Sequence, residues 1–153
     1  MKLYAPSTIR EIKEKYGFRL TKSLGQNFLT DKNIIDRIIE GAQIGENDLV
    51  IEIGPGIGVI TYETSIAARK VIAVEIDRNL IPILAETLAE RENIEVVNRD
   101  ILKTDVNALI AEAREKDPAI EKVRIIGNLP YYITTPIIMK LLEEAVCADG
   151  ITV

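Results

Sequence analysis

The residue types best suited to chemistry lie at positions 128–131, where the chain runs Asn-Leu-Pro-Tyr. The amino group of adenine is a poor nucleophile because its lone pair is delocalised, so a methylating site must hold the base and accept from its N–H groups. The Asn128 side-chain oxygen and the Leu129 carbonyl are two such acceptors, aimed by the restricted backbone of Pro130. Tyr131 can stack on a flipped-out base. The stretch therefore predicts adenine methylation without a metal or a strong general base; the alternative is a proline turn beside two core tyrosines.

A second candidate site is the glycine loop at 54–58, Gly-Pro-Gly-Ile-Gly, which follows the apolar run 49–53. Glycines let the backbone approach a ligand closely, and a helix after the loop offers free N–H groups at its N-terminus. Glu75 closes the next apolar run, about 20 residues further on, where an acidic side chain can accept from ribose hydroxyls. Gly54, Gly56 and Glu75 together predict the adenosine half of a cofactor site. The alternative is that the glycines only form a tight turn.

The spacing of these glycines bears on which cofactor binds. Dinucleotide sites favour G-x-G-x-x-G, whereas this loop has G-x-G-x-G with Glu52 just before it. The pattern resembles the first motif of S-adenosylmethionine (SAM) methyltransferases, whose cofactor has no pyrophosphate. SAM is therefore expected rather than NAD, and an NAD-dependent oxidoreductase is the alternative.

The elements that must position these residues alternate from residue 49 onward. Strands are expected at 49–53, 71–76, 94–98, 123–127 and 151–153, and helices at about 59–68, 79–91, 105–115 and 134–147. This alternation predicts an α/β, Rossmann-like fold, in which a parallel sheet of order 3-2-1-4-5 carries helices on both faces. Ligands bind beyond the carboxyl ends of such strands. Asp100, just after the third strand, is there a candidate acceptor for a cofactor adenine, or else a helix cap.

The first 47 residues are expected to form a basic helical arm. One helix should begin near Pro6, with Thr8 and Glu11 as a capping box, and end at Gly17, and Asp31 should cap a second helix. Residues 1–30 carry six basic and two acidic side chains, a net charge of +4, against 13 basic and 22 acidic side chains afterwards, a net charge of −9. Contact with nucleic-acid phosphates is therefore expected at the arm, although a solvated charged helix explains the charge equally well.

Composition limits what else the chain can be. It has 153 residues, 47% of them hydrophobic, with no histidine and a single cysteine, Cys147. One domain in the cytoplasm is expected, because no apolar run is long enough to span a membrane and the N-terminus lacks a signal-peptide core. A structural zinc site has no suitable ligands, and no metal is expected. Cys147 lies near the end of an apolar helix pattern and is expected in the core rather than as a nucleophile.

Five motifs, in order, resemble those of the KsgA-type (RsmA) ribosomal RNA adenine dimethyltransferases, relatives of the Erm resistance methyltransferases. They are KSLGQNFL at 22–29, EIGPGIG at 52–58, VEID at 74–77, RDIL at 99–102 and NLPYYITTP at 128–136. The resemblance covers nearly the whole chain and is closer to the housekeeping enzymes than to the resistance enzymes. It implies a SAM-dependent enzyme that makes N6,N6-dimethyladenine at two adjacent adenines near the 3′ end of small-subunit rRNA. The implied partner is that rRNA or the pre-ribosomal small subunit, and the implied role is in ribosome biogenesis.

The resemblance also implies which residues bind the cofactor and which bind the target base. The implied cofactor-binding residues are Gln26, Asn27 and Leu29 on the N-terminal side of the pocket, Gly54 and Gly56 at the methionine part, Glu75 at the ribose, Asp100 at the adenine, and Asn128. The implied catalytic residues, at the target adenine, are Asn128, Pro130 and Tyr131.

Members of the family continue well beyond this length, with further strands and a small helical RNA-binding domain. The expected domains are therefore the arm with a cofactor-covering loop at 1–47 and a truncated SAM-binding methyltransferase core at 48–153. The fifth strand would then be an exposed apolar edge, which predicts self-association near residues 151–153. SAM binding should be better retained than RNA methylation, and a non-catalytic RNA-binding or ribosome-assembly module is a further alternative.

Overall fold

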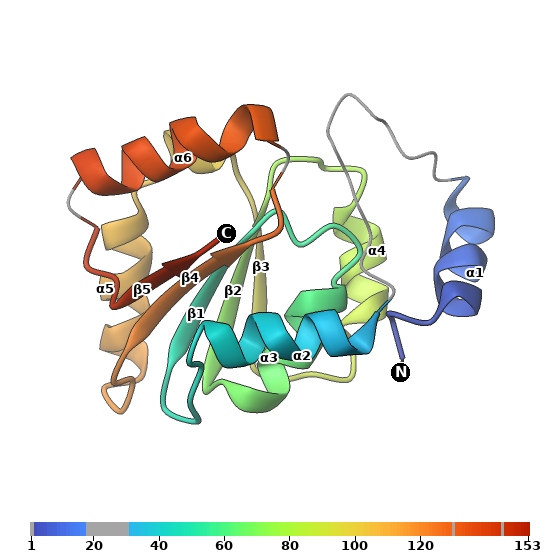
Figure 1. The fold of residues 1–153 in the computed structure, drawn as a ribbon, viewed down its shortest axis with the longest axis horizontal. Helices are drawn as coiled ribbons and strands as arrows, with labels where there is room; N and C mark the ends of the chain where they lie inside the picture. The colour runs from blue at the N-terminus through green and yellow to red at the C-terminus, as the bar shows by residue number, and fades with distance from the viewer. Residues whose placement is uncertain (1, 18–30, 130, 145) are drawn as a thin grey trace.

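The sheet has five parallel strands in the order β3-β2-β1-β4-β5 (Figure 1). The computed structural model describes residues 2–17, 31–129, 131–144 and 146–153. The strands are β1 (Leu49–Ile53), β2 (Lys70–Glu75), β3 (Ile94–Asn98), β4 (Val123–Gly127) and β5 (Gly150–Thr152). The predicted α/β fold and strand order are confirmed.

Helices connect the strands and cover both faces of the sheet (Figure 1). They are α1 (Pro6–Tyr16), α2 (Lys32–Gly41), α3 (Val59–Ala67), α4 (Ile81–Thr87), the 3-10 helix η2 (Ile101–Lys103), α5 (Val106–Lys116) and α6 (Tyr131–Glu143). None of the helices in the described part of the chain is both long enough and apolar enough to cross a membrane.

Alternate side chains of β1 enter cores on opposite faces of the sheet. Leu49, Ile51 and Ile53 pack in the core beneath α5 and α6, whereas Val50 packs beneath α2 and α3. Every residue of β1 is buried, as the β-branched run at 49–53 predicts for a central parallel strand. A third apolar cluster joins Ile9 of α1 to α3 and α4, so the N-terminal arm is packed onto the sheet domain.

The two N-terminal helices differ in how they begin. Asp31 caps α2, because its side chain accepts from the backbone N–H of Asn33 at 2.9 Å, as expected. Gly17 ends α1 in the left-handed region with φ 58°, also as expected. The prediction of a capping box formed by Thr8 and Glu11 is wrong, because α1 starts at Pro6 and has no side-chain cap. Proline supplies the first helical turn instead, since its fixed φ suits that position.

The C-terminal helix begins and ends earlier than the sequence pattern predicts. It spans 131–143 rather than 134–147, and Pro136 lies inside it. Cys147 therefore falls outside the helix, and its side chain is exposed, so the prediction that it belongs to the core is wrong. The segment after α6 instead packs Val146 and Ala148 against the core, while the Cys147 amide donates to Asn107 Oδ1 at 2.9 Å.

Candidate functional site

Parallel pairing brings the predicted site segments to one edge of the sheet. Ile53 pairs with Val74 of β2 on one side and with Gly127 of β4 on the other. Glu75 in turn pairs with Asn98 of β3. The glycine loop, Glu75, Asp100 and Asn128 therefore all lie at or just past the carboxyl ends of adjacent strands, where ligands bind in open α/β sheets.

The glycine loop contacts the stretch that was predicted to hold the target base. Gly54 has φ 69°, and a Cβ placed on it would lie 3.6 Å from Leu129 Cδ2. A Cβ on Gly127 would lie 3.1 Å from Leu129 Cγ. Leu129 therefore packs along the backbone of both strand ends, and Asn128, beside it, is exposed. The two candidate sites form one continuous surface.

Glu75 is tied to the glycine loop by hydrogen bonds. Its side chain is 4% exposed, Oε1 accepts from Gly56 N at 3.2 Å and Oε2 accepts from Asp77 N at 3.0 Å. Burial raises the pKa of Glu75, and these backbone donors oppose the rise. Both carboxylate oxygens keep further lone pairs, so the group is fixed in place and can still accept from a ligand.

The third strand end carries two polar side chains with different roles. Asn98 Nδ2 donates to the Glu75 carbonyl at 2.8 Å and holds the two strand ends together. Asp100 caps η2, because its Oδ1 accepts from Leu102 N at 2.9 Å. The capping role was the alternative to cofactor binding, but it uses only one of the carboxylate's acceptor positions, so the two roles are compatible.

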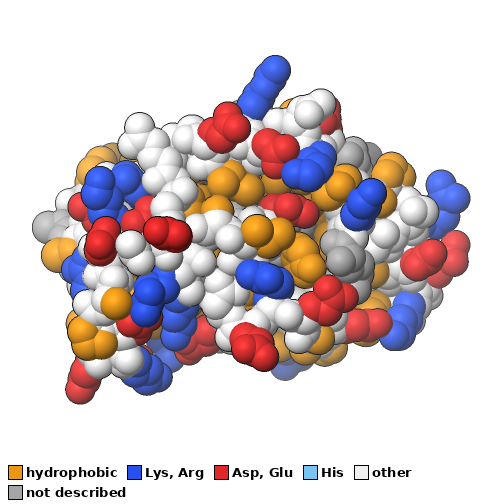
Figure 2. Space-filling model, turned by 90° about the horizontal axis from the view of Figure 1, so that it is seen from below, with side chains coloured by type: hydrophobic (Ala, Val, Ile, Leu, Met, Phe, Trp, Pro, Cys, Tyr) orange, Lys and Arg blue, Asp and Glu red, His pale blue; other side chains and the backbone are white. Residues whose placement is uncertain are grey.

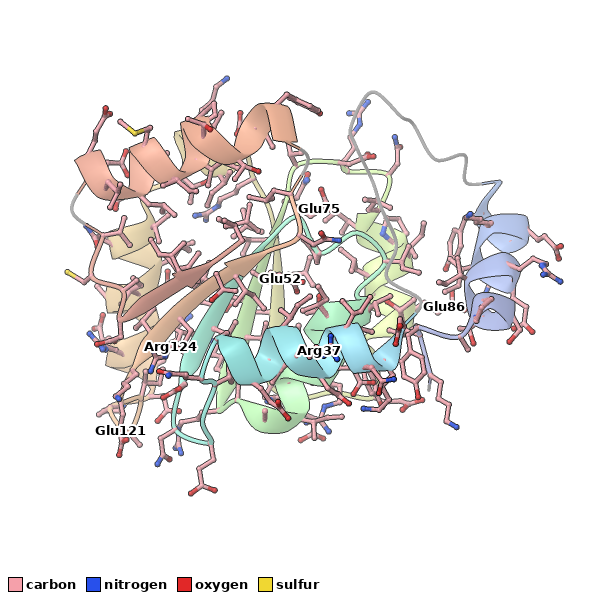
Figure 3. All side chains as sticks on the ribbon, viewed as in Figure 1. Arg37, Glu52, Glu75, Glu86, Glu121 and Arg124 are labelled. Carbon is pink, nitrogen blue, oxygen red and sulfur yellow. The ribbon has the colours of Figure 1, made fainter. Side chains whose placement is uncertain are left out.

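Glu52 forms a buried contact beneath the glycine loop that the sequence did not reveal. The side chain is 2% exposed and accepts a hydrogen bond from the Thr61 hydroxyl of α3. Burial raises the pKa of Glu52 to about 7, with a smaller contribution from the charge of Glu75. Figure 3 places Glu52 in the strand next to that of Glu75. This bond joins β1 to the first turns of α3 and so fixes both ends of the loop between them.

A family model described as ribosomal RNA adenine dimethylase matches residues 17–153. The chain belongs to the ribosomal RNA adenine dimethylase family. It is 54% identical over 152 residues to the ribosomal RNA small subunit methyltransferase A of Alkaliphilus metalliredigens. The aligned region covers 99% of this chain and 52% of the relative. The chain thus spans about half the length of the curated relatives that it matches.

Two solved structures support the same family assignment. The 23S rRNA methyltransferase ErmE aligns with a TM-score of 0.64 and 38% identity, over 78% of this chain and 44% of that one. A dimethyladenosine transferase from Plasmodium falciparum aligns with a TM-score of 0.58 and 31% identity, over 74% of this chain and 37% of that one. The fold is the Rossmann-like fold of SAM-dependent methyltransferases.

One apolar residue at this edge of the sheet was not predicted from the sequence as a candidate. Ile76 follows Glu75 and is 57% exposed at the carboxyl edge of the sheet. An apolar residue next to the candidate ribose acceptor suits the face of a nucleobase. The signal in the sequence was its position directly after the acidic residue that closes the second strand.

Several predicted site residues lie outside the described part of the chain. They are Gln26, Asn27, Leu29 and Pro130. Tyr131 is the first residue of α6, and its side chain is likewise outside the description. The structure therefore brings together Gly54, Gly56, Glu75, Asp100 and Asn128.

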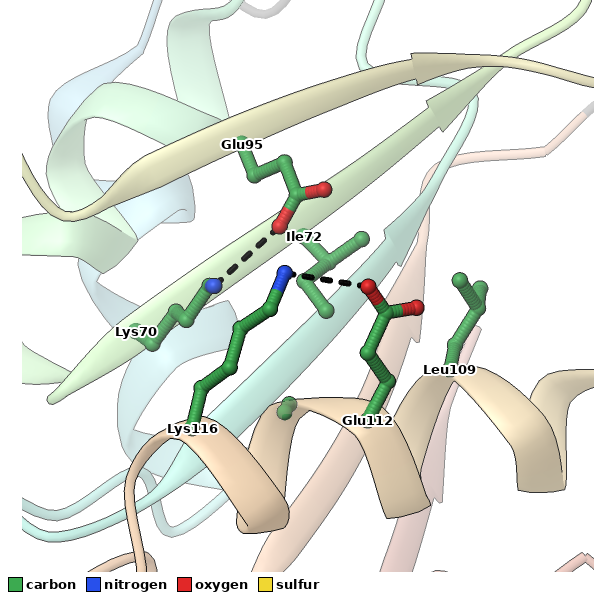
Figure 4. A pocket seen from close by; sticks show the side chains of 7 residues that line it. Lys70, Ile72, Glu95, Leu109, Glu112 and Lys116 are labelled. Carbon is green, nitrogen blue, oxygen red and sulfur yellow. Dashed lines mark hydrogen bonds and ion pairs between the residues drawn. The ribbon is translucent and has the colours of Figure 1, made fainter.

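A groove elsewhere on the dimethylase fold has different chemistry. It lies between β2, β3 and α5 and contains two ion pairs, Lys70 with Glu95 at 3.1 Å and Lys116 with Glu112 at 3.0 Å (Figure 4). Its charges are thus matched within the groove. Seen from below, acidic and basic side chains are interspersed and neither sign forms a patch (Figure 2). Among the described residues, no group of three or more acidic or cysteine side chains is arranged to hold a metal.

Proposed function

We propose that this chain is the catalytic portion of a SAM-dependent methyltransferase that dimethylates N6 of two adjacent adenines near the 3′ end of small-subunit rRNA, during ribosome biogenesis. The observation that carries the proposal is the packing of Leu129 on Gly54, because Asn128 and Leu129 then lie beside the glycine loop. Family membership and the names of the relatives support the same reaction class. In this proposal, residues 48–153 form the methyltransferase core and residues 1–47 the basic arm and cofactor cover.

The described residues fit SAM as the cofactor. Gly54 and Gly56 both have positive φ and carry no Cβ, so the backbone of the loop can approach a ligand closely. Glu75 accepts from ribose hydroxyls, Ile76 packs on the adenine, and Asp100 accepts from the adenine amino group. Gln26, Asn27 and Leu29 are proposed to cover the bound cofactor. Bound SAM supplies an electrophilic methyl group on a positively charged sulfur.

The chain's own contribution to the reaction is to hold the amine of the target adenine. The Asn128 side-chain oxygen and the Leu129 carbonyl accept from the two N–H groups, which favours a pyramidal nitrogen whose lone pair points at the methyl donor. Pro130 restricts this backbone, and Tyr131 stacks on the base. The nitrogen becomes cationic as it reacts, so its proton leaves to solvent without a strong base. Rate comes from positioning and from the two acceptors that face the developing charge.

The proposed RNA contact begins at the N-terminal arm. The arm carries the chain's basic excess, and Arg10 of α1 is exposed. Lys15 is less available to phosphates, because its Nζ pairs with Glu86 Oε1 of α4 at 2.7 Å. A partner in the small ribosomal subunit implies that the protein works in the cytoplasm.

Two measurements test the proposed function. Calorimetry should detect binding of SAM and not of NADH; the reverse result would indicate an oxidoreductase. Radiolabelled methyl transfer to immature small subunits should then be compared between this chain, the full-length Alkaliphilus relative and the variant N128A. We expect N128A to lower the transfer rate about a hundredfold and still to bind SAM. SAM binding without any transfer by the wild-type chain would instead favour a non-catalytic RNA-binding module.

We also propose that copies of this chain associate through β5. It is the last strand in the sheet order, so one side of its backbone is not paired within the sheet. Ile151 is 38% exposed and Val153 is 53% exposed. An apolar strand edge is a template for pairing with a second strand of the same kind.

A further inference from the structure

The two halves of the proposed site are carried by different elements. Asp100 is the N-cap of η2, and Asn128 lies three residues before α6. The distance between a cofactor adenine held by Asp100 and an amine held by Asn128 therefore depends on how η2 and α6 sit against each other. The two elements share apolar packing, since Ile101 of η2 and Ile137 and Leu141 of α6 belong to one buried cluster.

A buried lysine also joins these two elements. The Lys140 side chain of α6 is 10% exposed, and its Nζ donates to the Thr104 carbonyl at 2.6 Å, immediately after η2. The same Nζ donates to Glu144 Oε2 at 2.8 Å, on the residue that directly follows the end of α6. Burying an ammonium group costs free energy unless its N–H groups donate to acceptors. The two hydrogen bonds of the Lys140 ammonium group therefore indicate a specific contact.

The acceptor of this bond leads directly to Asp100. Thr104 Oγ1 donates to the Asp100 carbonyl at 2.7 Å, and Lys103 N donates to the same carbonyl at 2.9 Å. Together with the Asp100 cap on Leu102 N, these bonds make residues 100–104 a closed turn. A displacement of the Thr104 carbonyl is therefore expected to displace the Asp100 backbone as well.

We propose that Lys140 is a positioning residue that locks α6 to the 100–104 turn and so sets the spacing between the cofactor adenine and the target amine. This inference rests on the proposed function, which assigns the cofactor adenine to Asp100 and the target amine to Asn128. A lysine that only stabilised the fold would affect folding stability without coupling the two segments. A positioning lysine transmits the ordering of one segment to the other.

Hydrogen exchange of the whole chain tests this coupling, with S-adenosylhomocysteine as the probe ligand. In the wild-type protein, the ligand should slow exchange both in residues 101–104 and in residues 137–144, the second half of α6 with the residue after it, each by about threefold or more. In K140M it should slow exchange only in 101–104. K140R, which keeps a buried cation with donors, should behave as wild type. K116M removes an exposed lysine of α5 that also pairs with a glutamate four residues away, although Glu112 lies on its N-terminal side, and should also behave as wild type.

Activity provides a second readout. K140M should lower kcat for methyl transfer about tenfold while the Kd for SAM changes by less than about threefold, because misplacing reactants costs rate more than binding. K140R should recover most of the kcat. If K140M does not fold, K140Q, which keeps one donor and loses the charge, allows the same comparison.

The outcomes separate this inference from the proposed function. Ligand-induced slowing of 137–144 that persists in K140M, or is absent from the wild type although the ligand binds, overturns the positioning role. Failure of the wild type to bind the ligand at all overturns the proposed function instead. The contact between Lys140 and the 100–104 turn is then tested without ligand. Hydrogen exchange in 101–104 should be at least about threefold faster in K140M than in wild type and K140R, and equal rates would overturn the positioning role.

Discussion

The Leu129 side chain packs on Gly54, with its Cδ2 3.6 Å from the position of a Cβ on that glycine. One residue comes from the end of β4 and the other from the end of β1, and the two are 75 positions apart in the sequence. The contact exists because β1 and β4 pair in parallel, with Ile53 opposite Gly127. An enzyme that transfers a group between two bound molecules needs this kind of juxtaposition, because each binding motif alone places only one of them.

The first prediction concerns the backbone of the cofactor loop. Gly54 has φ 69°, so G54A forces an L-residue into the left-handed region at a cost of about 1 kcal/mol, and the loop should relax away from its ligand-binding shape. We expect the Kd for SAM to rise about tenfold in calorimetry. G41A is the matched control, because Gly41 ends a helix and a Cβ there meets nothing within 4 Å. It should leave SAM binding unchanged and slightly stabilise the fold. Equal SAM affinity in G54A and wild type would contradict the proposed loop contact.

The second prediction concerns the ribose acceptor. In E75Q, an amide replaces a carboxylate that accepts from Gly56 N and Asp77 N, and the new NH2 group faces one of those backbone donors. The Kd for SAM should rise by about tenfold or more, since both the ligand acceptor and the loop anchor are weakened. E95Q is the control, because Glu95 is an exposed partner of Lys70 in the groove beside α5. If E75Q and E95Q bind SAM equally well, Glu75 does not hold the ribose.

Much of this arrangement could be predicted from the sequence because it depends on local patterns. The alternation of apolar runs and helical segments determines a parallel sheet, and right-handed crossovers leave few strand orders. Asp31 and Gly17 mark helix ends by their own chemistry, which needs no tertiary partner. The strand-end positions of Glu75 and Asp100 followed from the same pattern.

The features that the sequence did not predict depend on long-range partners. Glu52 looked like part of a motif, but its buried bond to Thr61 depends on how α3 packs on β1. Lys140 has a glutamate four residues later, a pattern typical of an exposed helical pair, yet its side chain is nearly buried. The helix expected from about 134 begins at 131 instead, and it accommodates Pro136 at the loss of one backbone bond.

The third prediction is a pH dependence of stability that arises from Glu52. Its folded-state pKa of about 7 lies above the ordinary value of 4.5, so between these values the folded protein keeps a proton that the unfolded chain releases. The free energy of unfolding should therefore fall as pH rises from about 4.5 to about 7, by about 3 kcal/mol in total. Urea unfolding at a series of pH values measures this slope. Glu75, whose pKa is also raised, adds to it in the same direction.

The variant E52Q isolates the contribution of Glu52. Glutamine keeps an acceptor for Thr61 and cannot ionise, so most of the slope should disappear and the stability at pH 8 should match or exceed that of wild type. E112Q is the control, because the hydrogen bond from Lys116 lowers the pKa of the exposed Glu112, so its effect on stability falls below pH 4.5 and the slope between pH 4.5 and 7 should stay unchanged. An unchanged slope in E52Q would mean that the folded-state pKa of Glu52 is not raised above its ordinary value.

The last prediction concerns association through the sheet edge. If copies pair through β5, light scattering should show a mass that grows with protein concentration, and I151K should restore a monomer by placing a charge on the edge. Ile151 is 38% exposed, so the lysine can reach water and the fold should be retained. I66K is the control, because Ile66 is 60% exposed on α3, which is remote in the chain from β5. It should leave association unchanged, since the surface of a helix such as α3 offers no strand backbone for pairing with a second sheet. A wild-type monomer at millimolar concentration, or equal effects of I151K and I66K, would rule out pairing at this edge.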